Sequence, residues 1–101
     1  MRIFIGETDQ YKGKPLYEAI VNKARELNLA GATVTRGIMG FGADSRLHTA
    51  KILRLSEDLP VIIEIVDVQA KLDLLTPFLD EAVTEGLITS EKVKVVKYRH
   101  S

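Results

Sequence analysis

Few side chains in this chain of 101 residues have the types and spacing that catalysis needs. Ser45 and His48 lie three residues apart, where a hydroxyl and an imidazole could act as nucleophile and base, and Asp44 is the carboxylate beside them. The composition of a polar loop explains these residues equally well, because no other carboxylate is placed to orient the histidine. We therefore expect no catalytic residues and no enzyme activity.

Residues suited to metal binding or to acid–base catalysis are also scarce. His48 and His100 are the two histidines, and the chain has no cysteine, so a transition-metal site is not expected. Glu64 and Asp67 are close in sequence, but the alternation of an extended chain points them to opposite faces. The sequence thus predicts neither a metal site nor a pair of carboxylates for proton transfer.

A glycine pair offers a more specific signal. Gly40, Phe41 and Gly42 follow a β-branched run that begins at Thr33, and a polar run follows them. Glycine lets a ligand approach the backbone closely, and a phosphate needs backbone N–H groups together with cations. Lys92 and Arg99 are the candidate cations, although ordinary surface charge explains both equally well.

Composition limits the remaining classes. The 14 basic and 14 acidic side chains cancel, which argues against nucleic acid as the main partner. The sequence shows neither an apolar run long enough to span a membrane nor a signal peptide, and the lack of cysteine fits a cytoplasmic protein. The length predicts a single domain over residues 1–101.

Hydrophobic periodicity places these residues on six elements. One helix should begin at Pro15 and end at Gly31, and a second should follow an Asp67 N-cap, contain Pro77 and end at Gly86. The four expected strands cover residues 2–6, 33–39, 61–66 and 92–98. The order β-α-β-β-α-β predicts an α+β, ferredoxin-like fold: a four-stranded antiparallel sheet in the order 4-1-3-2, with both helices on one face.

The third strand predicts an interface. Its alternation sends Val61, Ile63 and Ile65 to the helices. The other face receives Ile62, Glu64 and Val66, which is more apolar than a solvated sheet face should be. We expect these last three residues to pack against other copies of the chain, with Arg36 or Lys94 of a neighbour beside Glu64. A half-exposed strand in a monomer is the alternative.

Three longer stretches carry a resemblance to a known family. GATVTRGIMGFGADSRLH, LPVIIEIVD and EGLITSEKVKV resemble the PII signal-transduction proteins, and YKGKPLYEAI with AGATVTRGIMGFG is similar to the PII-like DUF190 group. The resemblance implies a homotrimer with no obligatory cofactor that binds ADP, AMP or ATP between subunits, with or without Mg²⁺. It also implies a protein target, a membrane transporter or an enzyme, contacted by a mobile loop.

The same resemblance assigns individual residues. Thr33 and Val66 would border the adenine, and Gly86 and Lys92 would form the phosphate-binding loop, with Arg99 as a looser match to C-terminal arginines. The mobile loop would be residues 43–54, following the base at Gly40, Phe41 and Gly42. Its partner-binding side chains would be Asp44, Arg46, His48, Lys51 and Arg54.

The chain also departs from the PII pattern. One residue more than usual separates Thr33 from Gly40, so we expect a bulge at Gly37. Thr89, Ser90 and Glu91 stand where PII proteins have glycines, and the loop is shorter. These departures weaken the expectation of Mg-ATP chelation and 2-oxoglutarate sensing more than that of adenine binding.

Two other functions share the expected fold. An acylphosphatase-type enzyme needs an arginine in the loop after the first strand, where this chain has GETDQYKGK. A trimeric metal-tolerance protein of the CutA type would look PII-like without binding a nucleotide. Function depends on the site rather than on the fold, so both remain alternatives.

Overall fold

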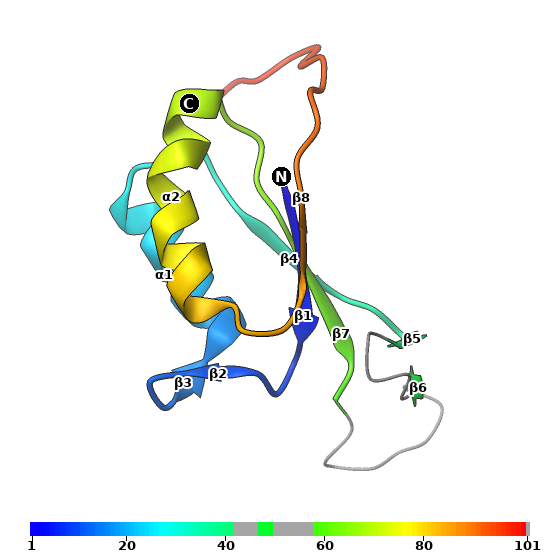
Figure 1. Ribbon diagram of the computed structural model, residues 1–101. Helices are drawn as coiled ribbons and strands as arrows, with labels where there is room; N and C mark the ends of the chain where they lie inside the picture. The colour runs from blue at the N-terminus through cyan, green and yellow to red at the C-terminus, as the bar shows by residue number, and fades with distance from the viewer. Residues whose placement is uncertain (42–46, 50–57, 101) are drawn as a thin grey trace.

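The computed structural model describes residues 1–41, 47–49 and 58–100, and it is built on one antiparallel sheet (Figure 1). The sheet has four strands in the order β4-β7-β1-β8. Both helices pack on the same face of the sheet, which confirms the predicted α+β architecture. The elements are β1 (Arg2–Gly6), α1 (Leu16–Glu26), β4 (Thr33–Arg36), β7 (Pro60–Glu64), α2 (Gln69–Ala82) and β8 (Leu87–Thr89).

The prediction for the fourth strand was wrong. Leu87–Thr89 pairs with Phe4–Arg2 of β1, whereas residues 92–98 form no strand and are exposed. The chain begins to pair with β1 directly after Gly86. Because Thr89 already pairs with Arg2, the first residue of β1, no part of β1 remains for residues 92–98 to pair with. The strand order therefore differs from the predicted one in the segment that takes the fourth place, while β1 and β7 are central as expected.

The predicted second strand is divided in two. β4 ends at Arg36, and β5 (Met39–Phe41) pairs with β6 (Leu47–Thr49) in a separate two-stranded sheet. Gly37 lies at the break and donates its N–H to the carbonyl of Pro60 at 2.7 Å. A Cβ on Gly37 would come within 2.7 Å of Pro60 Cγ, so a glycine is needed there.

The segment between β1 and α1 contains a hairpin that was not predicted from the sequence. β2 (Gln10–Tyr11) pairs with β3 (Lys14–Pro15) through a turn in which Lys12 and Gly13 have φ values of 49° and 79°. A two-residue turn with both residues at positive φ fits the twist of a hairpin. The sequence feature that indicates this turn is the Lys-Gly pair between two short polar segments. Lys-Gly is a weaker hairpin signal than Asn-Gly.

Helix α1 follows its predicted periodicity but ends earlier than Gly31. Leu16, Ile20 and Ala24 are buried at a spacing of four residues. Asn28 takes the left-handed conformation with φ 60°, and Leu29 N–H bonds to the carbonyl of Ala24 at 3.0 Å. This is a Schellman ending with asparagine in the position that glycine usually takes, so the prediction of a Gly31 terminator was wrong.

Helix α2 also begins and ends differently from expectation. Its N-cap is Val68, and the carboxylate of Asp67 instead accepts the N–H groups of Val68 and Ala30. The helix runs through Pro77 and ends at Ala82, four residues before Gly86. It is too short to cross a membrane, as is α1, and the part of the chain that the structure describes contains no other helix.

The two faces of the sheet differ as the third strand predicted. Val61, Ile63 and Ile65 are buried against the helices, together with Ile3 and Ile5 of β1. The other face, called the bare face below, carries two rows of side chains read from the strand register. The rows are Thr33, Glu64, Arg2 and Thr89, and Thr35, Ile62, Phe4 and Leu87.

Candidate functional site

The glycine pair begins at one corner of the sheet. Gly40 and Phe41 lie in β5, beyond the β4 edge and beside the start of β7, where Pro60 packs. A Cβ on Gly40 would stand 3.1 Å from Pro60 Cγ, which is tighter than an ordinary contact. Phe41 is 71% exposed, so its ring is free to stack on a flat ligand. Gly42 lies outside the described residues.

Thr33 and Val66 lie at the other end of the same edge. Thr33 opens β4 and pairs with Glu64, two residues before Val66, and both Thr33 and Val66 are exposed. The segment entering β4 is held to the end of β7 by the Asp67 carboxylate, which accepts Ala30 N–H at 2.9 Å. The structure thus brings these two predicted adenine contacts together, on either side of one strand pairing.

The predicted phosphate ligands lie on the opposite edge. Gly86 has φ 154°, and a Cβ there would come within 2.6 Å of the Phe4 carbonyl oxygen, so the backbone alone requires this glycine. Lys92 follows β8 and is exposed, one residue after Glu91, which contacts Arg2. Arg99 is exposed near the C-terminus, close to Tyr98, whose hydroxyl reaches the Ala30 carbonyl oxygen at 3.4 Å.

Gly40 and Lys92 are therefore diagonally opposed within one chain. Pro60, beside Gly40, is separated from Glu64 by four residues, or about 13 Å along a strand. Lys92 lies beyond β8, and three strand spacings, about 14 Å, separate β8 from β4. One phosphate group cannot contact both within a single chain, so a site that uses both must form between copies.

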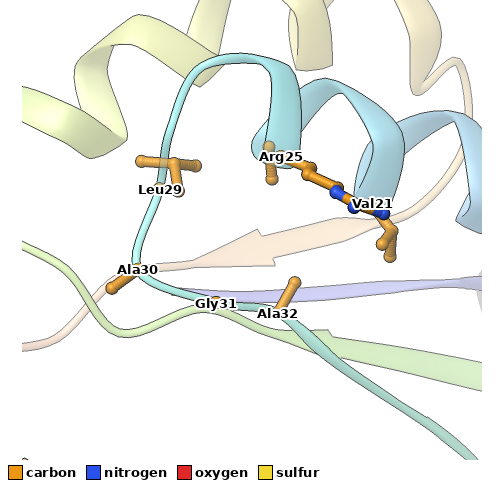
Figure 2. Close-up of a pocket in the computed structure, with 7 residues that line it drawn as sticks. Val21, Arg25, Leu29, Ala30, Gly31 and Ala32 are labelled. Atoms are coloured by element: carbon orange, nitrogen blue, oxygen red, sulfur yellow. The ribbon is translucent and has the colours of Figure 1, made fainter. Parts of the chain in front are cut away.

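A hollow of about 270 Å³ opens where α1 ends and the chain turns into β4 (Figure 2). Figure 2 shows Val21 and Arg25 on the helix side and Ala32 on the strand side. The side chains that line it are apolar apart from Arg25, which is exposed. Arg25 is a cation close to Thr33 that no sequence motif indicates, because lone arginines on helices are common.

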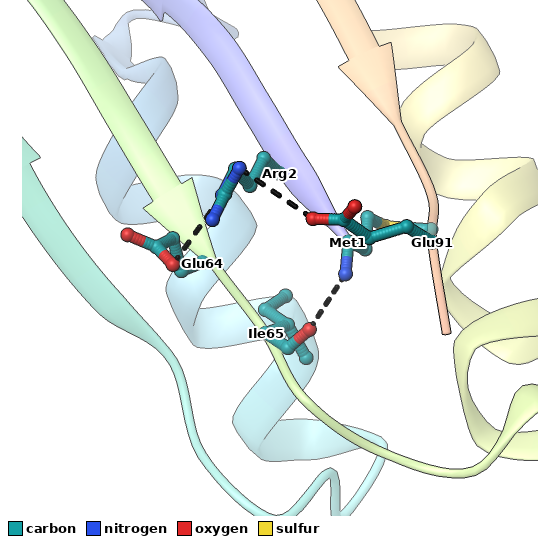
Figure 3. A network of polar contacts seen from close by, with 5 residues as sticks. All are labelled: Met1, Arg2, Glu64, Ile65 and Glu91. Atoms are coloured by element: carbon teal, nitrogen blue, oxygen red, sulfur yellow. Dashed lines mark hydrogen bonds and ion pairs between the residues drawn. The ribbon is translucent and has the colours of Figure 1, made fainter. Parts of the chain in front are cut away.

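Glu64 finds its partner within its own chain. The Arg2 guanidinium lies 3.5 Å from the Glu64 carboxylate and 3.6 Å from that of Glu91 (Figure 3). The expectation that Arg36 or Lys94 of a neighbour pairs with Glu64 is therefore not needed, and Arg36 itself contacts Glu7 at 2.9 Å. The register of β1 with β7 puts Arg2 opposite Glu64, which a correct strand alignment could have shown.

Most of the predicted partner-binding loop falls outside the described residues. Asp44, Arg46, Lys51 and Arg54 belong to that part of the chain. The backbone of His48 is described, and it pairs with Gly40 in the small β5–β6 sheet. Gly40 is thus joined by strand pairing to residue 48 of the predicted loop. Among the described residues, no group of three or more His, Cys, Asp or Glu side chains could hold a metal ion.

The comparison with known families decides the membership of this chain. The model of DUF190, described as "Uncharacterized ACR, COG1993", matches residues 1–95. The chain belongs to the DUF190 family. This confirms the narrower of the two resemblances seen in the sequence, and the match extends across both edges of the sheet.

Curated relatives of this DUF190 protein carry family-level names. It is 39% identical over 98 residues to a "UPF0166 protein" of Aquifex aeolicus (strain VF5), covering 95% of this chain and 90% of that protein. It is 35% identical over 98 residues to "UPF0166 protein MJ1524" of Methanocaldococcus jannaschii, covering 96% and 90%. Neither name states a ligand or an activity.

Proposed function

We propose that this DUF190 protein is a PII-like, non-catalytic regulator that binds an adenine nucleotide between copies of the chain. The observation that carries the proposal is Phe41, an exposed aromatic ring next to Gly40 at the corner of the sheet. An exposed ring beside a glycine backbone suits the ribose and phosphates of a nucleotide whose adenine lies toward Thr33 and Val66. The PII resemblance of the surrounding sequence supports the same assignment.

The placement of the cations supports a site shared between subunits. Within one chain Lys92 lies beyond β8, on the opposite edge of the sheet from Gly40, and the tail then crosses so that Tyr98, next to Arg99, reaches Ala30 near the start of β4. A second copy that brings its Lys92 to the first copy's Gly40 would complete the phosphate site. A homotrimer, with the bare faces packed around its axis, places each site between two neighbours.

The relay of binding to a target is the second part of the proposal. The β5–β6 pairing of Gly40 with His48 joins the phosphate-binding backbone to residues 43–54. A nucleotide that binds one arrangement of this pairing better than another would shift the population of loop conformations by that difference in affinity. The loop would then present its charged side chains to a transporter or an enzyme.

Nucleotide binding is tested by thermal unfolding and calorimetry with ATP, ADP, AMP and adenosine. At a hundredfold excess over Kd, a ligand stabilises the folded state by about 2.7 kcal/mol, which raises Tm by about 10 °C or more for a domain of this size. We expect the Lys92→Ala variant to lose more affinity for ADP than for adenosine, because it removes a charge that faces phosphate.

The matched control is Lys71→Ala, which removes the same charge from α2, away from both parts of the site. It should bind ADP as the wild type does. Equal losses for adenosine and ADP in Lys92→Ala would contradict the phosphate role of Lys92. Absence of both a thermal shift and binding heat with all four compounds would contradict the proposed function.

A further inference from the structure

The C-terminal segment 92–98, called the tail below, has the sequence of a strand but pairs with no strand in the described part of the chain. Its residues KVKVVKY are rich in side chains that favour extended structure. All of them are exposed, including the large apolar side chains of Val93, Val95, Val96 and Tyr98. An isolated stretch of this kind is unusual on a soluble domain and marks an interaction site.

The β4 edge presents the matching half of such a site. β4 bonds to β7 on one side, and among the described residues no strand bonds to its other side. Thr33, Val34 and Thr35 are β-branched and all four residues of β4 are exposed. Sheet edges that stay free usually carry charged side chains, proline or a bulge that prevents pairing, and β4 carries one of these before Gly37, the charged Arg36 at its end.

The described tail of the same chain does not fill this edge. The tail starts beyond β8 and must cross three strand spacings, about 14 Å, to reach the β4 side. It makes that crossing along the end of the sheet, where the Tyr98 hydroxyl meets the Ala30 carbonyl oxygen (Figure 1). Residues 92–98 are used in this crossing and form no strand beside β4.

We propose that the tail of one copy adds to the β4 edge of a second copy as an antiparallel strand. Strand addition supplies backbone hydrogen bonds for affinity and alternating side chains for specificity. Val93 and Val95 would lie beside Val34 on the face that packs on the helices. Lys92 and Lys94 would lie beside Thr35 and Thr33 on the bare face.

Charge favours this arrangement over its opposite. In the proposed register Lys94 adds to the row that contains Thr33, Glu64 and Arg2. The carboxylate of Glu64, half exposed and next to Arg2, would then have Lys94 in the same row on its other side, with Thr33 between them. The reverse alternation would place Lys92 and Lys94 beside Arg36, which has the same charge.

The added strand also deepens the proposed function, on which this step rests. A tail that lies along β4 carries the partner's Lys92 toward the end of β4 that leads to Gly40 and Phe41. The partner copy would thereby contribute a lysine to the phosphate site at Gly40. Assembly through the tail and binding of phosphate would be two results of the same contact.

Cysteine cross-linking tests the pairing directly, because the natural chain has no cysteine. Single variants Thr33→Cys and Lys94→Cys are mixed, allowed to exchange subunits and treated with a short bismaleimide, with no nucleotide present. We expect a covalent dimer in which peptide mapping joins positions 33 and 94. The matched control is Thr76→Cys, an equally exposed threonine on α2, which should not link to position 94.

A second measurement covers the case in which the cysteines disturb the site. The chain ending at Glu91 should keep its circular dichroism spectrum, because the tail has no buried side chain, and its mass in light scattering should fall toward that of a monomer. An assembly that is undiminished without the tail, no link between positions 33 and 94, or a monomeric wild type would each overturn the inference.

The two proposals can fail separately. A 33–94 link without any binding heat from nucleotides would keep strand addition and remove the nucleotide function. Nucleotide binding by a protein whose tail neither links to β4 nor affects assembly would keep the function and remove strand addition.

Discussion

Gly86 shows how a site residue can be required by the backbone alone. The sequence placed it in a phosphate-binding loop, but its φ of 154° and the Phe4 carbonyl oxygen, 2.6 Å from where a Cβ would lie, already demand glycine. Gly40 differs, because its φ is ordinary and only Pro60 crowds it. Backbone geometry and packing therefore account for Gly86 more fully than for Gly40, so a ligand-binding role has more support at Gly40.

Gly86→Ala should lower the free energy of unfolding by more than about 1 kcal/mol, since alanine at a strained positive φ costs more than its gain in chain stiffness. Urea unfolding measures the change. Gly31→Ala is the control, because a Cβ at Gly31 meets nothing within 4 Å and its φ is not in the left-handed region. Equal stability of the two variants would contradict this account of Gly86.

At the scale of elements, the β2–β3 hairpin is fixed to α2 by one tyrosine. Tyr11 packs edge-on against Phe78 with ring centroids 5.2 Å apart, and its hydroxyl donates to the Glu81 carboxylate at 2.6 Å. The hydrogen bond to Glu81 raises the pKa of Tyr11, because ionised tyrosine would lose a donor and repel the carboxylate. The hairpin should therefore loosen in alkali.

The sign of the effect follows from proton linkage. The contribution of Tyr11 is fully present below pH 10, the ordinary tyrosine pKa, and is lost as pH rises through the higher folded pKa. We expect the free energy of unfolding to fall more steeply above pH 10 in the wild type than in Tyr11→Phe. Tyr17→Phe is the control, because the Tyr17 hydroxyl makes no hydrogen bond to another described residue. Parallel profiles for wild type and Tyr11→Phe would show that the bond contributes nothing.

Pro77 lies inside α2, where a proline is expected to destabilise the helix. A proline in a helix interior removes one backbone hydrogen bond and costs about 3 kcal/mol, yet α2 runs from Gln69 to Ala82 as one helix. Pro77→Ala should raise the free energy of unfolding by about 1–3 kcal/mol, as measured by chemical denaturation. A loss of stability would mean that the proline ring makes packing contacts worth more than the missing bond.

Sequence patterns foresaw the elements whose partners are local. Leu16, Ile20 and Ala24 set the buried face of α1, and the alternation of Val61 to Ile65 set the two faces of β7. The fourth strand was placed wrongly because residues 92–98 have the better strand sequence, while Leu87–Thr89 has the available edge of β1. Strand propensity is a property of one segment alone, whereas strand pairing depends on which segment of the chain reaches a free sheet edge first.

The candidate site was predictable to a similar degree. Gly40, Thr33 and Val66 were predicted from sequence as site residues, and the structure places them along one side of the sheet, while their role stays a prediction. Arg2 was missed because its role depends on the register that sets it opposite Glu64. The separation of Lys92 from Gly40 was also hidden, since distance across a sheet is a property of topology and not of sequence spacing.

At the scale of the whole molecule, the bare face is expected to hold copies together. One of its two rows is largely apolar and consists of Thr35, Ile62, Phe4 and Leu87. Ile62 lies on a central strand. Ile62→Lys should dissociate the assembly by placing like charges against one another, as light scattering at micromolar concentration would show. Leu74→Lys, on the exposed side of α2, should leave the mass unchanged.

The same scale includes the relay to a target. Hydrogen exchange with and without ADP should show slower exchange in residues 43–54 as well as around Gly40, if binding at the glycine pair limits the loop. Protection restricted to the neighbourhood of Gly40, with an unchanged rate in residues 43–54, would contradict the relay while leaving nucleotide binding intact.

The central claim is that copies of this chain complete a nucleotide site that one copy lacks. Calorimetric titration of ADP into the wild type and into Ile62→Lys, side by side, tests it most directly. The account predicts saturable binding of one ADP per chain to the wild type, and loss of that binding in the dissociated but folded variant. Undiminished ADP binding by the monomeric variant, or no binding by the wild type, would contradict it.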